Sequence, residues 1–237
     1  MKRALIILGL VVFASLQTTY ADPTGSAFNS RDYLADSHNR PQWSVGLYHG
    51  VQKRDMTSGI GSGVFEMRRQ FVRVGYNVQP WLSIFGGAGQ AEMKPSGSPS
   101  HLDSDSEYHY GVHVRLVDHE FEDVKMVENY VRIDLTYMVS DSDNDDFSWE
   151  EDSASLMFSF VNELGRDQIY TPHSIGLFAG PYWSDIDASV GSFAFSEQDD
   201  LGLVAGLNIY FNPHFSFQWE LQMFEENSSQ LGLRFRF

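Results

Sequence analysis

Cysteine is absent from the 237 residues, lysine occurs only four times, and acidic residues outnumber basic ones by 32 to 16. Without cysteine the chain forms no disulfide and offers no site for lipoprotein acylation. The formal net charge of −16 argues against nucleic acid as a partner, because binding phosphates requires clustered lysine and arginine. The composition thus excludes disulfides and lipoprotein acylation and argues against nucleic-acid binding, but it does not exclude export.

Long apolar runs are also missing, apart from one at the start of the chain. Residues 4–16 are apolar, follow Lys2 and Arg3, and are too few to cross a bilayer as a helix. This is the pattern of a secretory signal peptide, which we assign to residues 1–21. Residues 22–41 show no clear period, and we expect a periplasmic N-terminal segment there.

What the chain does have is a two-residue alternation of apolar and polar side chains from residue 42 to residue 237. Such alternation is typical of β-strands with one apolar face. The low mean hydropathy of −0.28 does not contradict a membrane protein, because the two faces of a strand average out. The pattern predicts ten strands, at about 42–51, 64–77, 81–89, 108–116, 127–140, 153–162, 173–183, 200–211, 215–224 and 230–237.

The last eight residues, QLGLRFRF, show the alternation most plainly. Gln230 is followed by Gly232, and aromatic residues occupy the third-last and last positions, Phe235 and Phe237. This segment resembles the C-terminal assembly signal of bacterial outer-membrane β-barrels. The resemblance implies a Gram-negative outer-membrane location, and recognition of these residues by the barrel-assembly machinery.

The spacing of the connections agrees with a barrel. With both ends of an even-numbered barrel in the periplasm, the connections at 52–63, 90–107, 141–152 and 184–199 lie outside the cell and are mostly long. The connections at 77–80 and 212–214 then lie inside and are short. We therefore predict an all-β, antiparallel up-and-down transmembrane barrel, porin-like, with ten strands; eight or twelve stay open.

A soluble β-sandwich or lipocalin-like barrel is the alternative to this interpretation, since it shows the same alternation. Three features favour the membrane. The strands reach nine to fourteen residues, which suits a tilted crossing of about 9 to 11. Aromatic residues gather near strand ends, as in an interfacial girdle. The face opposite the apolar one carries arginines, acids and glycines, which suit a packed lumen.

If the apolar face meets lipid, a set of charged residues points into the lumen. The set comprises Arg69, Arg73, Arg115, Arg132, Arg234 and Arg236 with Glu128, Asp134 and Glu220. Arginine can hold a carboxylate by two hydrogen bonds and stays charged when crowded. We expect a salt-bridged, structural lumen held by these three acids. The excess of arginine over acid also permits a narrow, weakly anion-preferring pore.

Two further chemistries receive weaker support. Asp141, Asp143 and Asp145 have the one-three-five spacing of a calcium loop, but the required glycine is replaced by Asp146. A solvated acidic loop, or one sharing divalent cations with lipopolysaccharide, is the simpler interpretation. Histidines are present, yet none falls in a motif of outer-membrane phospholipases or proteases.

From these patterns we expect no catalytic residues, no cofactor and no resident metal. The predicted role is structural or surface-interacting, with acidic extracellular loops. A narrow porin is the alternative, and a hydrolase is less favoured. The expected partners are outer-membrane lipid, lipopolysaccharide and the assembly machinery, and the protein is expected to be a monomer.

Overall fold

The computed structural model describes residues 43–59, 61–79, 81–96, 105–122, 128–143, 147–164, 172, 174–190, 192–198, 200–212 and 214–237. The expected signal peptide and the segment 22–41 lie outside these residues, as does Asp145. No helix among the described residues is long and apolar enough to cross a bilayer.

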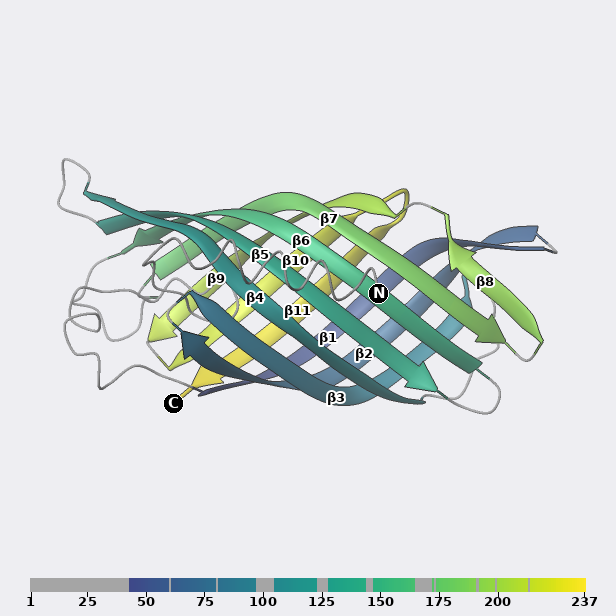
Figure 1. Cartoon of the computed structure of the whole chain (residues 1–237). Helices are drawn as coiled ribbons and strands as arrows, with labels where there is room; N and C mark the ends of the chain where they lie inside the picture. Colours follow the sequence, from purple (N-terminus) through teal and green to yellow (C-terminus); the bar gives the residue numbers. More distant parts are fainter. Residues whose placement is uncertain are drawn as a thin grey trace.

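In the described part of the chain, eleven strands form one antiparallel sheet (Figure 1). They are β1 (Trp43–Ser58), β2 (Gly61–Gln79), β3 (Leu82–Pro95), β4 (Asp105–Glu122), β5 (Glu128–Asp143), β6 (Phe147–Glu163), β7 (Ser174–Val190), β8 (Phe193–Glu197), β9 (Leu201–Asn212), β10 (Phe215–Met223) and β11 (Asn227–Arg236).

Ten of these strands make a closed up-and-down barrel. Each pairs with its neighbour in the chain, except that β7 pairs with β9 past the short β8, and β11 pairs with β1 to close the ring. The two ends of this ring are joined at Trp43 and Phe237, whose backbones exchange N–H···O bonds of 3.1 and 3.0 Å. The predicted ten-stranded antiparallel barrel is confirmed.

The outer wall of the barrel is apolar and the lumen is polar near the chain ends. On β1, Leu47 is 51% exposed on the outside, whereas Ser44 and Tyr48 are buried inside. The same alternation leaves many large apolar side chains on the outer wall, including Val72, Val74, Ile84, Val131, Phe158, Phe160, Leu177, Leu201, Leu203, Leu231 and Leu233. A continuous apolar wall of this extent suits lipid and not water.

Aromatic side chains border this wall. Near the chain ends, Trp43 lies 4.7 Å from Tyr76 between ring centroids, and Phe215 lies 4.9 Å from Phe235. Towards the opposite end, which we call the outer end, Tyr108 and Trp183 are exposed on the outside. Aromatic rings at both borders of an apolar band are typical of a membrane barrel.

Several strands continue well past the length that a bilayer requires. β1 has 16 residues and β2 has 19, whereas about 9 to 11 residues cross a membrane. Half or more of each predicted outer loop is therefore strand, and these loop predictions were wrong. β5 runs to Asp143 and β6 begins at Phe147, so little of the acidic connection 141–152 is left between strands.

The short strand β8 was not predicted, and it changes the shape of the barrel at the outer end. It pairs with β7, with Ala188 opposite Phe195, and with β1, with Met56 opposite Glu197. β8 thus joins β1 and β7 beyond the tops of the shorter strands β9 to β11 (Figure 1). The pairing closes a second, smaller ring of eight strands, β1 to β8, which we call the outer segment.

Candidate functional site

The lumen is the candidate site, and a buried apolar cluster fills its outer end. The cluster, which we call the outer plug, consists of Met56, Phe65, Met67, Ala91, Met93, Trp149, Ile186 and Ala188, with Phe195 of β8 packed against it. Met56 and Ile186 have no exposed surface. The outer segment therefore has a conventional hydrophobic core where a pore would need an opening.

A network of buried charges lies directly beneath the outer plug. Arg69 donates to Glu151 at 2.7 Å and to Glu107, and its guanidinium lies 5.0 Å from the Trp149 ring. Glu151 also accepts a hydrogen bond from Tyr182 at 3.3 Å. Because both carboxylates are fully buried, they depend on these donors to replace water.

Arg54 secures the point where β1 changes its partner from β11 to β8. Its guanidinium is 2.8 Å from Glu197, donates to Gln222 at 3.1 Å and to Ser228 at 2.9 Å, and lies 3.8 Å from the Phe224 ring. Through these contacts Arg54 links β1 to β8, β10 and β11 at the point where β8 and β11 diverge.

Glu197 belongs to β8, outside the membrane-spanning part of the barrel. Burial, reinforced by the negative charge of Glu151, outweighs the attraction of Arg54 and raises the pKa of Glu197 to about 8. This carboxyl therefore holds its proton over part of the neutral pH range.

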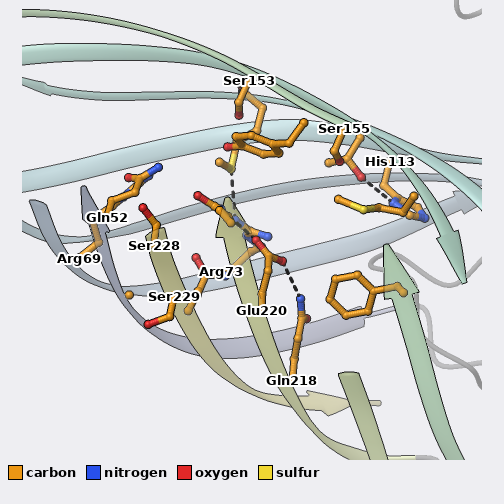
Figure 2. Close-up of a pocket in the computed structure, with 18 of the residues that line it drawn as sticks. Gln52, Arg69, Arg73, His113, Ser153, Ser155, Gln218, Glu220, Ser228 and Ser229 are labelled. Atoms are coloured by element: carbon orange, nitrogen blue, oxygen red, sulfur yellow. Dashed lines mark hydrogen bonds between the residues drawn. The ribbon is translucent and has the colours of Figure 1, made fainter. Parts of the chain in front are cut away.

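Below the charged network the lumen opens into a cavity of about 140 Å³. Its walls combine amide and hydroxyl side chains with charged, aromatic and methionine side chains. Figure 2 shows the polar lining, which includes Gln52, Ser153, Ser155, Gln218, Glu220, Ser228 and Arg73. The cavity is polar enough to hold water or a small polar ligand.

A second charged network borders the inner side of the cavity. Arg115 donates to Asp134 at 2.9 Å and lies 3.4 Å from Asp118, while Arg132 donates to Asp118 at 2.9 Å. The β-bulge between Arg115 and Val117 turns Asp118 towards this cluster. Two buried ion networks therefore bracket the cavity along the barrel axis.

His113 links two residues of β5 at the edge of the cavity. Its Nδ1 is 3.0 Å from the Thr136 hydroxyl and its Nε2 is 3.3 Å from Asp134. The order of hydroxyl, imidazole and carboxylate is also that of a catalytic relay. Here Asp134 is shared with Arg115 in an ion pair, so the arrangement also serves the packing of the lumen.

The structure places most of the charged residues predicted for the lumen inside the barrel. Arg69, Arg115, Arg132, Arg234, Arg236 and Asp134 are buried, and Arg73 and Glu220 are half-buried and line the cavity. The side chain of Glu128 is outside what the structure describes. The predicted partners differ from those found, because among the three named acids only Asp134 has a described ion pair with an arginine.

Five charged lumen residues escaped the sequence analysis: Arg54, Glu107, Asp118, Glu151 and Glu197. All five fall in segments predicted as loops or turns. Extending the two-residue alternation beyond the predicted strand ends would have found several of them. Glu107, for example, lies on the same face of its strand as His109 and His113. Among the described residues the lumen then holds seven arginines and six acids, which removes most of the predicted arginine excess.

The acidic residues considered for metal binding do not converge. Asp141 is exposed on the outer wall of β5, and the side chain of Asp143 is not described. Tyr137 donates to Asp152, the twelfth position of the calcium-like pattern, at 2.9 Å. Within the described part of the chain, no group of three or more histidine or acidic side chains has the geometry to hold a metal ion.

The residues of the assembly signal divide between the two faces of β11. Phe235 and Phe237 are exposed on the outer wall, at 47% and 66%. Gln230 and Gly232 face the lumen, and a Cβ at Gly232 would lie 2.6 Å from the ring of Tyr48. Glycine is required there because the tyrosine ring lies against the β11 backbone.

Comparison with known proteins gives matches in structure alone. No protein-family model and no curated protein sequence matches the chain. An outer-membrane channel of Pseudomonas putida F1 is 10% identical with a TM-score of 0.42, over 89% of this chain and 100% of that chain. Neisserial surface protein A is 13% identical with a TM-score of 0.34, over 83% and 97% of the two chains.

A third similar structure is Ail, the attachment invasion locus protein of Yersinia pestis, solved in complex with the heparin analogue sucrose octasulfate. It is 11% identical with a TM-score of 0.26, over 82% of this chain and 98% of that chain. Such scores assign no role, and the class follows from the chain's own geometry. A closed antiparallel barrel with an apolar outer wall and two aromatic borders is the architecture of outer-membrane β-barrel proteins, and this chain has it.

Proposed function

We propose that this protein is a non-conducting outer-membrane barrel that holds a rigid, folded outer segment above the membrane as a surface-interaction module. The observation that carries the proposal is the outer plug. A core of eight buried apolar residues fills the ring β1 to β8, and the charged network of Arg69, Glu107 and Glu151 lies immediately beneath it. An open pathway would require both layers to move.

The shape of the outer segment supports an interaction role. Strand-forming residues there continue as a paired sheet instead of ending in flexible loops, and their outward side chains are charged. Glu66 on β2, for example, is 3.0 Å from Arg68 and 3.7 Å from Lys94. A rigid polar surface loses little conformational entropy when it meets a partner.

A narrow pore is the alternative function, and its main support was an excess of arginine in the lumen. The near balance of seven arginines and six acids among the described residues weakens that support. Three of these arginines are also neutralised by carboxylates in direct contact, as in the pairs of Arg69 with Glu151 and Arg115 with Asp134.

Conductance of the refolded protein in a planar bilayer tests the proposal. We expect no measurable single-channel current from the wild type over the range of voltages that the bilayer tolerates. A variant with Trp149 of the plug and Arg69 of the charged network beneath it both replaced by glycine opens both layers, and it serves to show that a perforated barrel is detected in the same setup. A clear, anion-selective current from the wild type would overturn the proposal in favour of the pore.

We also propose that the assembly machinery recognises the exposed C-terminal aromatic residue. The side chain of Phe237 is 66% exposed, so replacing it removes little packing inside the protein. We expect Phe237→Ser to refold in vitro with nearly the wild-type unfolding midpoint but to reach the outer membrane in lower yield in cells. Equal yields would argue against recognition of this residue. Leu231→Ser, also on the outer face of β11, is the matched control.

A further inference from the structure

Arg73 of β2 is a guanidinium inside the barrel without a carboxylate partner among the described residues. It donates to His109 at 3.3 Å and to the sulfur of Met138 at 3.2 Å. The rings of Phe85, Tyr48 and Phe71 lie 4.6 to 5.3 Å from the guanidinium carbon and fix its position. Since a guanidinium has five N–H donors and Arg73 lines the cavity, donors remain for a ligand there.

Glu220 of β10 is the complementary case. Its two oxygens accept hydrogen bonds from the amides of Gln218 at 3.2 Å and Gln222 at 2.9 Å. It forms no ion pair with any residue in the described part of the chain. An ionised carboxylate can accept about four hydrogen bonds, so each oxygen keeps room for a donor.

The two side chains face the same cavity without touching each other. Both line the space of about 140 Å³, on strands that lie far apart in the sequence. Figure 2 shows Arg73 and Glu220 projecting into its centre, with Gln218 bonded to Glu220. Two opposite charges kept apart on the walls of a cavity need water or a ligand between them that satisfies both.

The volume of the cavity limits the size of a ligand that could lie between Arg73 and Glu220. The cavity is about as large as an engineered cavity of roughly 150 Å³ that accommodates benzene, a molecule of six carbon atoms. A ligand that satisfies both charges must carry an anionic group and a cationic group a few bonds apart. A carboxylate would receive paired N–H donors from Arg73, and an ammonium group would donate to Glu220.

From this geometry we infer that the lumen cavity is a binding site for a small zwitterion of the amino-acid class, with its carboxylate at Arg73 and its ammonium at Glu220. The site is independent of conduction, because it needs only the cavity that lies between the two charged networks. It adds ligand binding to the role of the barrel proposed above.

Glycine is the simplest probe of this site, with acetate and methylammonium as its two halves. The wild-type protein is refolded in detergent micelles with each compound present from the start, and the shift of its thermal unfolding midpoint is followed with concentration. A ligand that binds only the folded protein raises the midpoint. We expect glycine to raise it in a saturable manner, and each half-molecule to bind about tenfold more weakly or worse.

Two single variants test the assigned contacts. Arg73→Gln and Glu220→Gln each remove one unpaired charge, so we expect both to fold with at least the wild-type midpoint and to lose at least about tenfold in glycine affinity. Arg68→Gln and Glu150→Gln are matched controls, because these side chains face outward on β2 and β6 and are exposed. We expect their glycine response to equal that of the wild type.

Other outcomes would overturn the inference. If Arg73 and Glu220 serve as partners of each other in solution, both single variants will lower the midpoint and glycine will change nothing. If acetate binds as tightly as glycine and is insensitive to Glu220→Gln, the cavity is a simple anion site. If no probe shifts the midpoint of a folded wild-type protein, the cavity holds water.

Discussion

The part of the barrel near the chain ends and the outer segment use the same strands with opposite chemistry. Along β1, Leu47 faces outward and Ser44 faces inward, whereas Lys53 faces outward and Met56 faces inward. The side-chain period of two is never broken between them. The surrounding medium changes from lipid to water, and the apolar face moves from the outside of the wall to the inside.

This difference shows that alternation alone reports a strand and not its surroundings. An apolar exterior with a polar lumen identifies the lipid-embedded part. An apolar interior with charged outer residues, such as Asp185 and Asp187 flanking Ile186, identifies a water-exposed barrel with its own core. Four mutational experiments test this difference between the lipid-embedded part and the outer segment.

The largest expected effect is in the outer plug. Trp149 of β6 is 2% exposed within the core of the outer segment, and Trp149→Ala should lower the free energy of unfolding by about 3 to 5 kcal/mol. Trp183 of β7 is exposed on the outer wall, so Trp183→Ala should cost much less. Urea unfolding of the refolded proteins measures both. Equal costs would mean that the outer segment has no core.

The next effect concerns the lipid-facing wall. Arginine at Ile133, on the outer face of β5, should cost about 2 to 4 kcal/mol if that position lies near the bilayer midplane. Arginine at Thr136, which lines the cavity, should cost less than half as much. The measurement is the free energy of unfolding from lipid vesicles. A reversed order would exchange the inside and the outside of the barrel.

A smaller effect is expected from the inner charged network. Asp134→Asn removes one carboxylate from Arg115, but Asp118 remains 3.4 Å from the same guanidinium. We therefore expect a loss of about 1 to 3 kcal/mol in unfolding free energy, without any single-channel current. Asp141→Asn is the control on the same strand, because Asp141 is exposed on the outer wall. A stable variant that conducts anions would instead support a pore.

The smallest effect is a pH dependence confined to the outer segment. The folded protein raises the pKa of Glu197 from 4.5 to about 8, so between these values the folded state holds a proton that the unfolded chain releases. Its contribution to stability is therefore present at low pH and is lost as the pH rises towards 8.

Unfolding midpoints measured across that pH range, for the wild type and for Glu197→Gln, isolate this contribution. The wild type should lose stability relative to the variant as the pH rises. Glu150→Gln, an exposed acid on the outer wall, should follow the wild type. A difference between wild type and Glu197→Gln that does not change with pH would contradict the raised pKa.

The sequence predicted the lipid-embedded strands well because one side of each is uniformly apolar. Val131, Ile133 and Leu135 on β5 show this side clearly. It predicted the outer segment badly because the strands there lack this apolar outer side. Where a strand leaves the lipid, acids and serines occupy its outer face, and runs such as residues 141–152 have the composition of a loop.

The site was predictable in kind but not in detail. The two-residue alternation placed Arg69 and Arg73 inside the barrel, since both lie on the same face of β2 as Phe71. It gave no information on which acid each arginine meets, because that depends on register across strands distant in sequence. Arg69 and Glu151 are 82 residues apart in the chain, and Arg73 has no carboxylate partner among the described residues.

The closing seam between β1 and β11 contains a feature with a consequence for folding. The ring of Tyr48 lies across Gly46 of its own strand and Gly232 of the opposite strand, where an added Cβ would approach it to 2.4 and 2.6 Å. A slip of β11 by two residues preserves the inward and outward faces, but it brings Gln230 or Arg234 beneath the ring in place of Gly232. Each has a Cβ that the ring leaves no room for. The Tyr48 ring therefore permits only the register in which Gly232 lies opposite it. The C-terminal strand must adopt this register against the first strand for the barrel to close.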